Sequence, residues 1–152
     1  MRATSHDDLA AALRNGGLRV TAPRLAVLAA VTDGKHITAE QVALVARERV
    51  GAISTQAVYD VLGVLTRGGF VRRIEPAGSA ARYETRVGDN HHHVVCRSCG
   101  AIADVDCVVG DPPCVAPADA GGFVIDEAEL TFWGRCPDCQ THPQAADKER
   151  GG

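Results

Sequence analysis

Apolar positions in the first half of the chain recur with the period of an α-helix. The clearest case lies between residues 54 and 69, where one face collects Ala57, Val58, Val61, Leu62 and Leu65. Three more helices are expected over residues 7–14, 21–31 and 38–50, since capping Thr residues and glycine pairs stand at several of their ends. This half of the chain is therefore predicted to be helical.

Two β-like segments follow the last of these helices, at residues 70–76 and 81–87, with Gly78 in the turn between them. Two helices followed by a β-hairpin is the order of a winged helix-turn-helix, whose second helix enters the major groove of DNA. The opposite face of that helix stays polar and carries Gln56, Tyr59, Asp60 and Gly63. A plain helical bundle with an edge hairpin is the alternative.

The second half of the chain has a different pattern. Short strands are expected at residues 91–96, 101–107, 123–125 and 130–133, and the segments between them are rich in Pro and Gly. The chain is thus predicted to be α+β, with a winged-helix domain at 1–87 and a small α/β domain at 88–152. The acidic, glycine-bearing link at 87–90 forms the boundary, and the residues after Cys139 form a polar tail.

Charge divides the chain in the same way. Residues 1–80 hold ten Lys and Arg against seven Asp and Glu, whereas residues 81–152 hold six against twelve. A mildly basic front half suits phosphates and an acidic back half suits cations. The chain has no apolar run long enough to span a membrane and no signal-peptide pattern, so a cytoplasmic location is expected.

Four of the six cysteines form two identical Cys-x-x-Cys hooks. Cys96 and Cys99 are separated by 36 residues from Cys136 and Cys139. Two such hooks can close a tetrahedral four-thiolate cage, which suits a structural Zn²⁺ and leaves no open position. Redox dithiols and an iron–sulfur cluster are the alternatives. Cys107 and Cys114 remain as small buried apolar residues or as a switchable disulfide.

A second metal site is expected at the three consecutive histidines. If they lie on a strand, His91 and His93 share one face and His92 takes the other. The carboxylates of Glu84, Asp89, Asp104 and Asp106 are near them in sequence. Imidazoles combined with carboxylates suit Fe²⁺ or Mn²⁺, although zinc and nickel also accept imidazole. The alternatives are a surface histidine run, and a zinc hydrolase, for which the chain has neither an HExxH motif nor an evident general base.

Five segments together resemble the ferric uptake regulator family in their order and spacing. They are "GLRVTAPRLAVL", "HITAEQV", "STQAVYDVL", "HHHVVCRSCG" and "CPDC", and the likeness extends over about residues 8–140. Within the family the chain most resembles FurA-like members that lie beside catalase-peroxidase genes and are related to the peroxide-responsive PerR branch.

The resemblance implies a homodimeric, non-enzymatic repressor with a winged-helix domain and a C-terminal dimerisation domain. Its structural zinc site falls on the four hook cysteines. Its regulatory site for Fe²⁺ or Mn²⁺ falls on His36, Glu84, His91, His93 and Asp104. An ion shared by the two domains would set the spacing of two recognition helices and favour the DNA-competent arrangement.

The implied operator is an AT-rich inverted repeat. Arg19 and Arg24 would contact phosphates, while Gln56 and Tyr59 would face the bases. The implied signals are Fe²⁺ and peroxide, and the implied targets are a catalase-peroxidase gene and the repressor's own gene. A zinc- or nickel-responsive uptake regulator of the same family is the alternative.

Three positions depart from the family pattern. Asp60 stands where the family usually has Arg, which alters the surface that reads DNA. Glu84 in "RYE" matches the iron sensors, whereas Asp104 matches the peroxide sensors. Ala128 stands where some members have a histidine of a third metal site, so that site is not predicted here.

Overall fold

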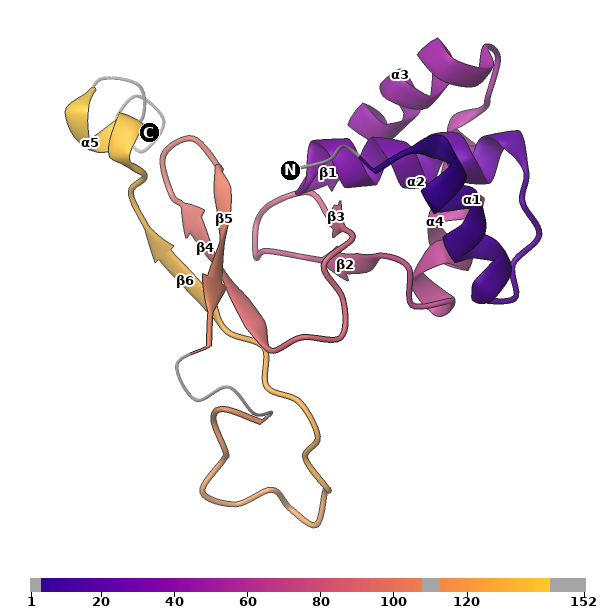
Figure 1. Cartoon of the computed structure of the whole chain (residues 1–152). Coiled ribbons are helices and arrows are strands. Elements are labelled where there is room, and N and C mark those ends of the chain that lie inside the picture. The colour runs from indigo at the N-terminus through magenta and orange to yellow at the C-terminus, as the bar shows by residue number, and fades with distance from the viewer. Residues whose placement is uncertain (1–3, 108–112, 143–152) are drawn as a thin grey trace. The chain divides into compact units, whose positions relative to one another are not determined.

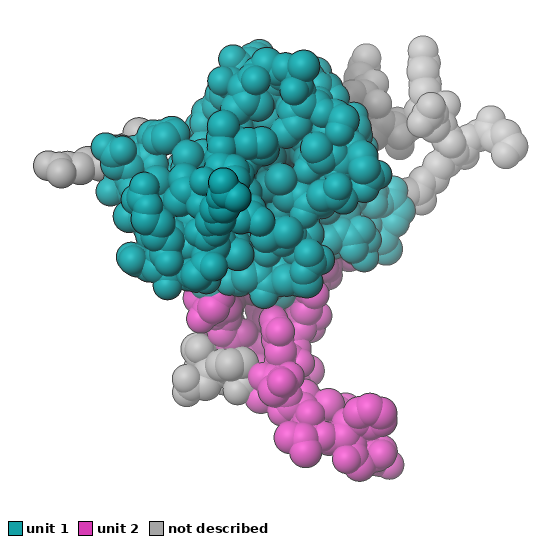
Figure 2. Space-filling model, turned by 90° about the vertical axis from the view of Figure 1, so that its right-hand side faces the viewer, with its two compact units in different colours: residues 1–87 teal, residues 88–152 magenta. Residues whose placement is uncertain are grey.

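A computed structural model describes residues 4–107 and 113–142. The chain divides into two compact units, residues 1–87 and 88–152, which Figure 2 colours separately. Most of the polar tail predicted after Cys139 lies at 143–152, outside the described residues. Each unit is described below by itself.

Four helices build the first unit (Figure 1): α1 (His6–Asn15), α2 (Ala22–Gly34), α3 (Ala39–Val50) and α4 (Thr55–Arg67). Each begins at a Ser or Thr whose side chain accepts a hydrogen bond from a backbone N–H of the first turn: Ser5, Thr21, Thr38 and Ser54. Such caps satisfy N–H groups that have no partner within the helix. The helices predicted from the apolar period are all confirmed.

The core of the first unit lies where these helices meet. Val58, Leu62 and Leu65 of α4 are fully buried, as the spacing of its apolar face predicts. They belong to one apolar cluster with residues of the other three helices, among them Leu13, Val31 and Val42. Burial of this face orients α4, so its polar residues face outwards.

A small antiparallel sheet completes the first unit. It comprises β1 (Ile37–Thr38), β2 (Arg72–Ile74) and β3 (Arg82–Glu84) in the order β1-β3-β2. Gly78, in the turn that joins β2 and β3, has a positive φ of 74°, which glycine adopts without steric strain. Helices α3 and α4 followed by this hairpin form a winged helix-turn-helix, as predicted. The two-residue strand β1 was not predicted because it is too short to show a period.

The second unit is built on a three-stranded sheet with the order β5-β4-β6, followed by a short helix. Its elements are β4 (His91–Cys96), β5 (Ile102–Asp106), β6 (Thr131–Gly134) and α5 (Pro137–Thr141). β5 runs antiparallel to β4, and β6 runs parallel to it. The predicted α+β class, with a winged helix and a second small domain, is confirmed.

One expected strand does not form. Residues 123–125 are irregular, and Val124 is 95% exposed. The β-branched and apolar residues of the segment 123–125 favour a strand. A strand also needs a neighbouring strand to which its backbone groups can hydrogen-bond. Among the described residues, no strand pairs with this segment.

No helix among the described residues has the length and apolar character that crossing a bilayer requires.

The buried face of α4 can be tested with two Leu→Ala substitutions. Leu62 is 0% exposed, whereas Leu44 on α3 is 62% exposed. Leu62→Ala should lower the free energy of unfolding by about 2–5 kcal/mol, because it removes packed atoms and leaves a cavity. Leu44→Ala, the matched control, should change it by less than about 0.5 kcal/mol. Urea unfolding followed by circular dichroism measures both, and equal effects would contradict the assigned core.

Candidate metal centres

The two Cys-x-x-Cys hooks meet because of the pairing between β4 and β6. Cys96 ends β4 and lies opposite Gly134, the last residue of β6. Cys99 lies in the turn after β4, Cys136 directly precedes α5, and Cys139 lies within α5. The parallel pairing therefore brings together two hooks that are far apart in sequence.

The four sulfur atoms lie at distances that suit a shared ion. All of them are within 4.8 Å of one another, and the Cys99 and Cys136 sulfurs are 3.6 Å apart. Zn–S bonds of about 2.3 Å in a tetrahedron place neighbouring sulfurs about 3.8 Å apart. A disulfide would need a separation of about 2.05 Å. The donor set and its spacing thus fit a four-thiolate zinc site, as predicted.

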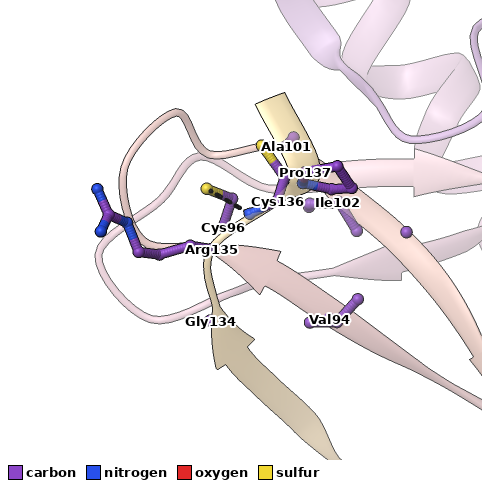
Figure 3. Close-up of a pocket in the computed structure, with 9 residues that line it drawn as sticks. Val94, Cys96, Ala101, Ile102, Gly134, Arg135, Cys136 and Pro137 are labelled. Carbon is purple, nitrogen blue, oxygen red and sulfur yellow. Dashed lines mark hydrogen bonds between the residues drawn. The ribbon is translucent and has the colours of Figure 1, made fainter. Parts of the chain in front are cut away.

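The surroundings of these cysteines act on the pKa of their thiols in opposite directions. The backbone N–H of Cys136 donates to the Cys96 sulfur at 3.3 Å (Figure 3). This hydrogen bond is the largest cause that lowers the pKa of Cys96 to about 6. The neighbouring sulfurs, that of Cys136 first, raise the pKa of Cys139 to about 12. Crowded thiols resist losing all of their protons, and a cation at their centre removes that resistance.

A mainly apolar pocket of about 190 Å³ adjoins Cys96 and Cys136 (Figure 3). Its other lining residues come from β4, the start of β5 and the segment leading into α5: Val94, Ala101, Ile102, Ala103, Gly134, Arg135 and Pro137. These side chains offer no nitrogen or carboxylate ligand at neutral pH. This pocket therefore adds no ligand to the four sulfurs, which form one cluster among the described residues.

A different kind of pair lies in the first unit. β1 and β3 are antiparallel, with Ile37 opposite Tyr83, so His36 and Glu84 come next in the same register. The His36 Nε2 and Glu84 Oε2 atoms are 3.2 Å apart. Glu84 is buried, at 2% exposure, and a buried carboxylate needs a cationic or hydrogen-bonding partner. The winged helix thus holds one imidazole and one carboxylate of the predicted regulatory site side by side.

The second unit gathers the other predicted ligands on one face of its sheet. His91 and His93 are two residues apart on β4, and their rings are 4.9 Å apart. Asp104 lies opposite His93 on β5, and its Oδ1 is 3.5 Å from His93 Nε2 and 3.8 Å from His91 Nε2. This cluster offers nitrogen and oxygen ligands and no sulfur. The predicted alternation of His91 and His93 against His92 is confirmed by the strand.

Asp89 has a place that the sequence did not reveal. Its Oδ1 is 2.5 Å from His91 Nδ1, so the carboxylate holds the ring on the side away from Asp104. A hydrogen bond at Nδ1 leaves Nε2 as the ligand atom and fixes the direction in which it points. In the sequence Asp89 is only one of several nearby carboxylates, because spacing along a loop does not indicate where a side chain points.

The predicted DNA-contacting residues lie on the outside of the first unit. Gln56 and Tyr59 are exposed on α4, Arg19 is exposed before α2, and Arg24 is half-buried in its first turn. In the free protein these side chains also make local bonds. Tyr59 donates to Glu40, which raises the pKa of Tyr59, and Gln56 donates to Asp60 at 2.9 Å.

Comparison with known proteins decides the family. Residues 15–112 match the sequence model of the ferric uptake regulator family. The chain belongs to this family. It is 57% identical over 136 residues to the transcriptional regulator FurA of Mycobacterium tuberculosis, covering 90% of this chain and 92% of that protein. It is 60% identical over 126 residues to ferric uptake regulation protein 1 of Mycolicibacterium fortuitum, covering 83% and 78% of the two chains.

Solved structures of the family agree with this fold. The ferric uptake regulator of Pseudomonas aeruginosa, solved with manganese, superposes with a TM-score of 0.60 and 26% identity. The match covers 85% of this chain and 98% of that one. This member of the ferric uptake regulator family is accordingly a transcriptional regulator and not an enzyme, and the hydrolase alternative is set aside.

Removing zinc should unfold the second unit of this ferric uptake regulator family member. The single tryptophan, Trp133 on β6, reports on that unit, since Arg97 of the first hook lies over its ring at 5.3 Å. A strong chelator should shift Trp133 fluorescence to the red, and added Zn²⁺ should restore it, because metal binding contributes folding free energy. Cys136→Ser should show the shift without chelator, whereas Ser98→Ala, in the turn of the first hook, should not. An unchanged spectrum after complete zinc removal contradicts a structural site.

Proposed function

We propose that this protein is a metal-dependent transcriptional repressor that binds an AT-rich inverted-repeat operator as a homodimer and releases it when its regulatory ion is lost or oxidised. The observation that carries the proposal is that the ligands divide into two chemical kinds. Four thiolates suit a permanent zinc ion, whereas the imidazole and carboxylate clusters suit a harder, exchangeable ion.

The regulatory ion would be Fe²⁺ or Mn²⁺, held by His36, Glu84, His91, His93 and Asp104. The His36–Glu84 pair supplies two ligands from the DNA-binding unit, and the His91, His93 and Asp104 cluster supplies three from the other. Neither group is complete for a five- or six-coordinate ion by itself. One ion shared by the two groups of ligands would favour the arrangement of the two units that binds DNA. Loss of the ion would remove the preference for that arrangement.

Peroxide would act on the same ligands. When bound, Fe²⁺ would supply the redox chemistry that activates a peroxide, and in the net reaction the imidazole ring gives up the two electrons that reduce the O–O bond. His36 and His91 are the imidazoles proposed to gain one oxygen atom, with water as the other product. An oxidised ring no longer binds metal as imidazole does, so the operator would be released. Mn²⁺ would support repression without this response.

DNA recognition would centre on α4 as the helix in the major groove. Gln56 and Tyr59 would face the bases, and Arg19 and Arg24 would contact phosphates. Asp60 accepts the hydrogen bond from Gln56 in the free protein and places a negative charge beside the base-reading side chains. It therefore selects against contacts that bring a phosphate near this part of α4.

Homodimer formation is supported by apolar surface on the second unit. Phe123 is 78% exposed, Val124 95% and Phe132 47%. Large apolar side chains exposed to this extent favour a surface that another protein covers. A second copy of this unit would cover them and would hold two winged helices on one inverted repeat.

The proposed targets are a catalase-peroxidase gene and the repressor's own gene, with the protein in the cytoplasm. A zinc- or nickel-responsive regulator of the same family is the alternative. The carboxylates of Glu84 and Asp104 beside the imidazoles favour iron or manganese, because harder ions prefer oxygen ligands.

The proposal is tested by operator binding with defined metals. Zinc-loaded protein should bind its own upstream DNA only after Fe²⁺ or Mn²⁺ is added, as measured by fluorescence anisotropy. His93→Ala should abolish that metal-dependent binding, whereas His142→Ala, a matched control at an exposed histidine, should retain it. Hydrogen peroxide should release DNA from the Fe²⁺ form only, with a gain of one oxygen atom on the peptide that contains His36 or His91.

Two results would contradict it. Tight operator binding by protein that holds only the four-sulfur ion would show that no regulatory metal is needed. DNA release by peroxide with both histidines unmodified would exclude the oxidation step while leaving metal-dependent repression in place.

Asp89 provides a further test. Asp89→Ala should weaken Mn²⁺ binding by about 10- to 100-fold, because a ligand imidazole that loses its supporting carboxylate is less basic and less well oriented. Asp126→Ala, which removes an exposed carboxylate from the segment before β6, should leave Mn²⁺ affinity unchanged. Isothermal titration of zinc-loaded protein measures both, and equal affinities would remove Asp89 from the site.

A further inference from the structure

The opposite face of β4 carries a second cluster that the proposed function does not use. His92 points to this face because neighbouring residues of a strand alternate. Val105 lies opposite His92 on β5, and Cys107, two residues further, points to the same side as Val105. Together with Asp106, Cys114, Val115, Leu130 and Phe132, these residues line a pocket of about 170 Å³.

Three ligand atoms meet in this pocket. His92 Nε2 is 2.9 Å from the sulfur of Cys114, and both atoms lie within 4.8 Å of the sulfur of Cys107. Ligands on one tetrahedral zinc ion, with Zn–N about 2.0 Å and Zn–S about 2.3 Å, are about 3.6 Å apart. The 2.9 Å separation is shorter than that value and those from the Cys107 sulfur are at most 4.8 Å, so the three atoms lie close enough to be drawn onto one ion. His92 is 3% exposed, so the imidazole that faces the sulfurs is buried.

We propose that His92, Cys107 and Cys114 form an additional binding site for a soft d¹⁰ cation, Zn²⁺ or Cu⁺. Two thiolates with one imidazole select soft or borderline ions and disfavour Fe²⁺, Mn²⁺ and Mg²⁺ relative to carboxylate sites. The site shares no residue with the four-sulfur cluster, and it lies on the other face of β4 from His91 and His93. It therefore extends the protein's chemistry beyond the proposed function.

Binding an ion here requires specific proton movements. The backbone N–H of Leu130 donates to His92 Nδ1 at 3.3 Å, which places the ring proton on Nε2, towards the sulfur of Cys114. When the ion takes Nε2, that proton moves to Nδ1 and the long hydrogen bond from Leu130 is given up. The two thiols release their protons to water, so one bound ion displaces two protons.

A bound ion would connect two segments of the second unit and would keep one coordination position open. Cys107 directly follows β5, whereas Cys114 belongs to a separate irregular segment. A shared ion would tie that segment to the sheet face beside His92. Three protein ligands leave a fourth tetrahedral position open towards the pocket, which suits an exchangeable ion better than the closed four-sulfur cage.

The test compares metal content in matched variants of the full-length protein. Reduced protein is equilibrated with excess Zn²⁺, or with Cu⁺ under anaerobic conditions, and weakly held metal is removed before analysis by mass spectrometry. The wild type should retain one more ion per chain than Cys107→Ser/Cys114→Ser. Val115→Ser, which alters the neighbouring pocket residue without removing a ligand, should match the wild type.

The separate experiments with Zn²⁺ and with Cu⁺ identify the ion, and Co²⁺ provides an independent spectroscopic signature of the site. Extra metal in the zinc arm or in the copper arm supports the site and names its occupant. Co²⁺ titration of the wild type should add a thiolate charge-transfer band that is missing from the double variant. If the double variant fails to fold, Cys114→Ser replaces it in the comparison, because this substitution changes only the irregular segment.

Equal metal content in wild type and Cys114→Ser overturns the proposal. So does a Cys107–Cys114 disulfide that forms in the metal-equilibrated wild type, detected as a loss of two hydrogen atoms, with no additional ion. Neither result depends on operator binding. Failure here leaves the proposed repressor function intact, and failure of metal-dependent DNA binding leaves this site intact.

Discussion

The backbone pairing of β4 with β5 and β6 is the constraint on which the chemistry of this protein depends. Hydrogen bonds on both edges hold β4 extended, so neighbouring side chains must take opposite faces. His91 and His93 therefore join Asp104, while His92 turns towards Cys114. The same pairing brings Cys96 next to the second hook. A slip of one residue in this register would exchange the two faces and separate the clusters of the second unit.

Because the faces are separated, ligands of different softness occur close together in sequence without competing. The sulfurs of the hooks gather at one end of the sheet, and the imidazoles with carboxylates gather on one face. Each cluster suits a different class of ion through its donor atoms alone. The crowding that raises the pKa of Cys139 keeps that thiol protonated until a bound cation replaces the proton. The hydrogen bond that the Asp89 carboxylate accepts from His91 Nδ1 shows how a neighbouring carboxylate orients a nitrogen ligand.

In the winged helix, apolar packing orients the side chains, without a metal ion. Buried Val58, Leu62 and Leu65 fix the rotation of α4, and this leaves Gln56 and Tyr59 on the exposed side. The antiparallel register of β1 and β3 then sets His36 against Glu84 in the same unit. The first unit thus carries both the helix proposed to read DNA and two of the side chains proposed to bind the regulatory ion.

Local sequence was sufficient for the helices, for most strands and for the grouping of the hook cysteines, because capping, period and Cys-x-x-Cys spacing act over a few residues. The strand predicted at 123–125 did not form, since an apolar segment becomes a strand only when a neighbour pairs with it. Only the tertiary structure joined Asp89 to His91 and Cys114 to His92, because side-chain direction in loops follows from long-range contacts. For the same reason, the contact between His36 and Glu84, which are separated by 47 residues in the sequence, depended on the pairing of β1 with β3 and not on spacing in the chain.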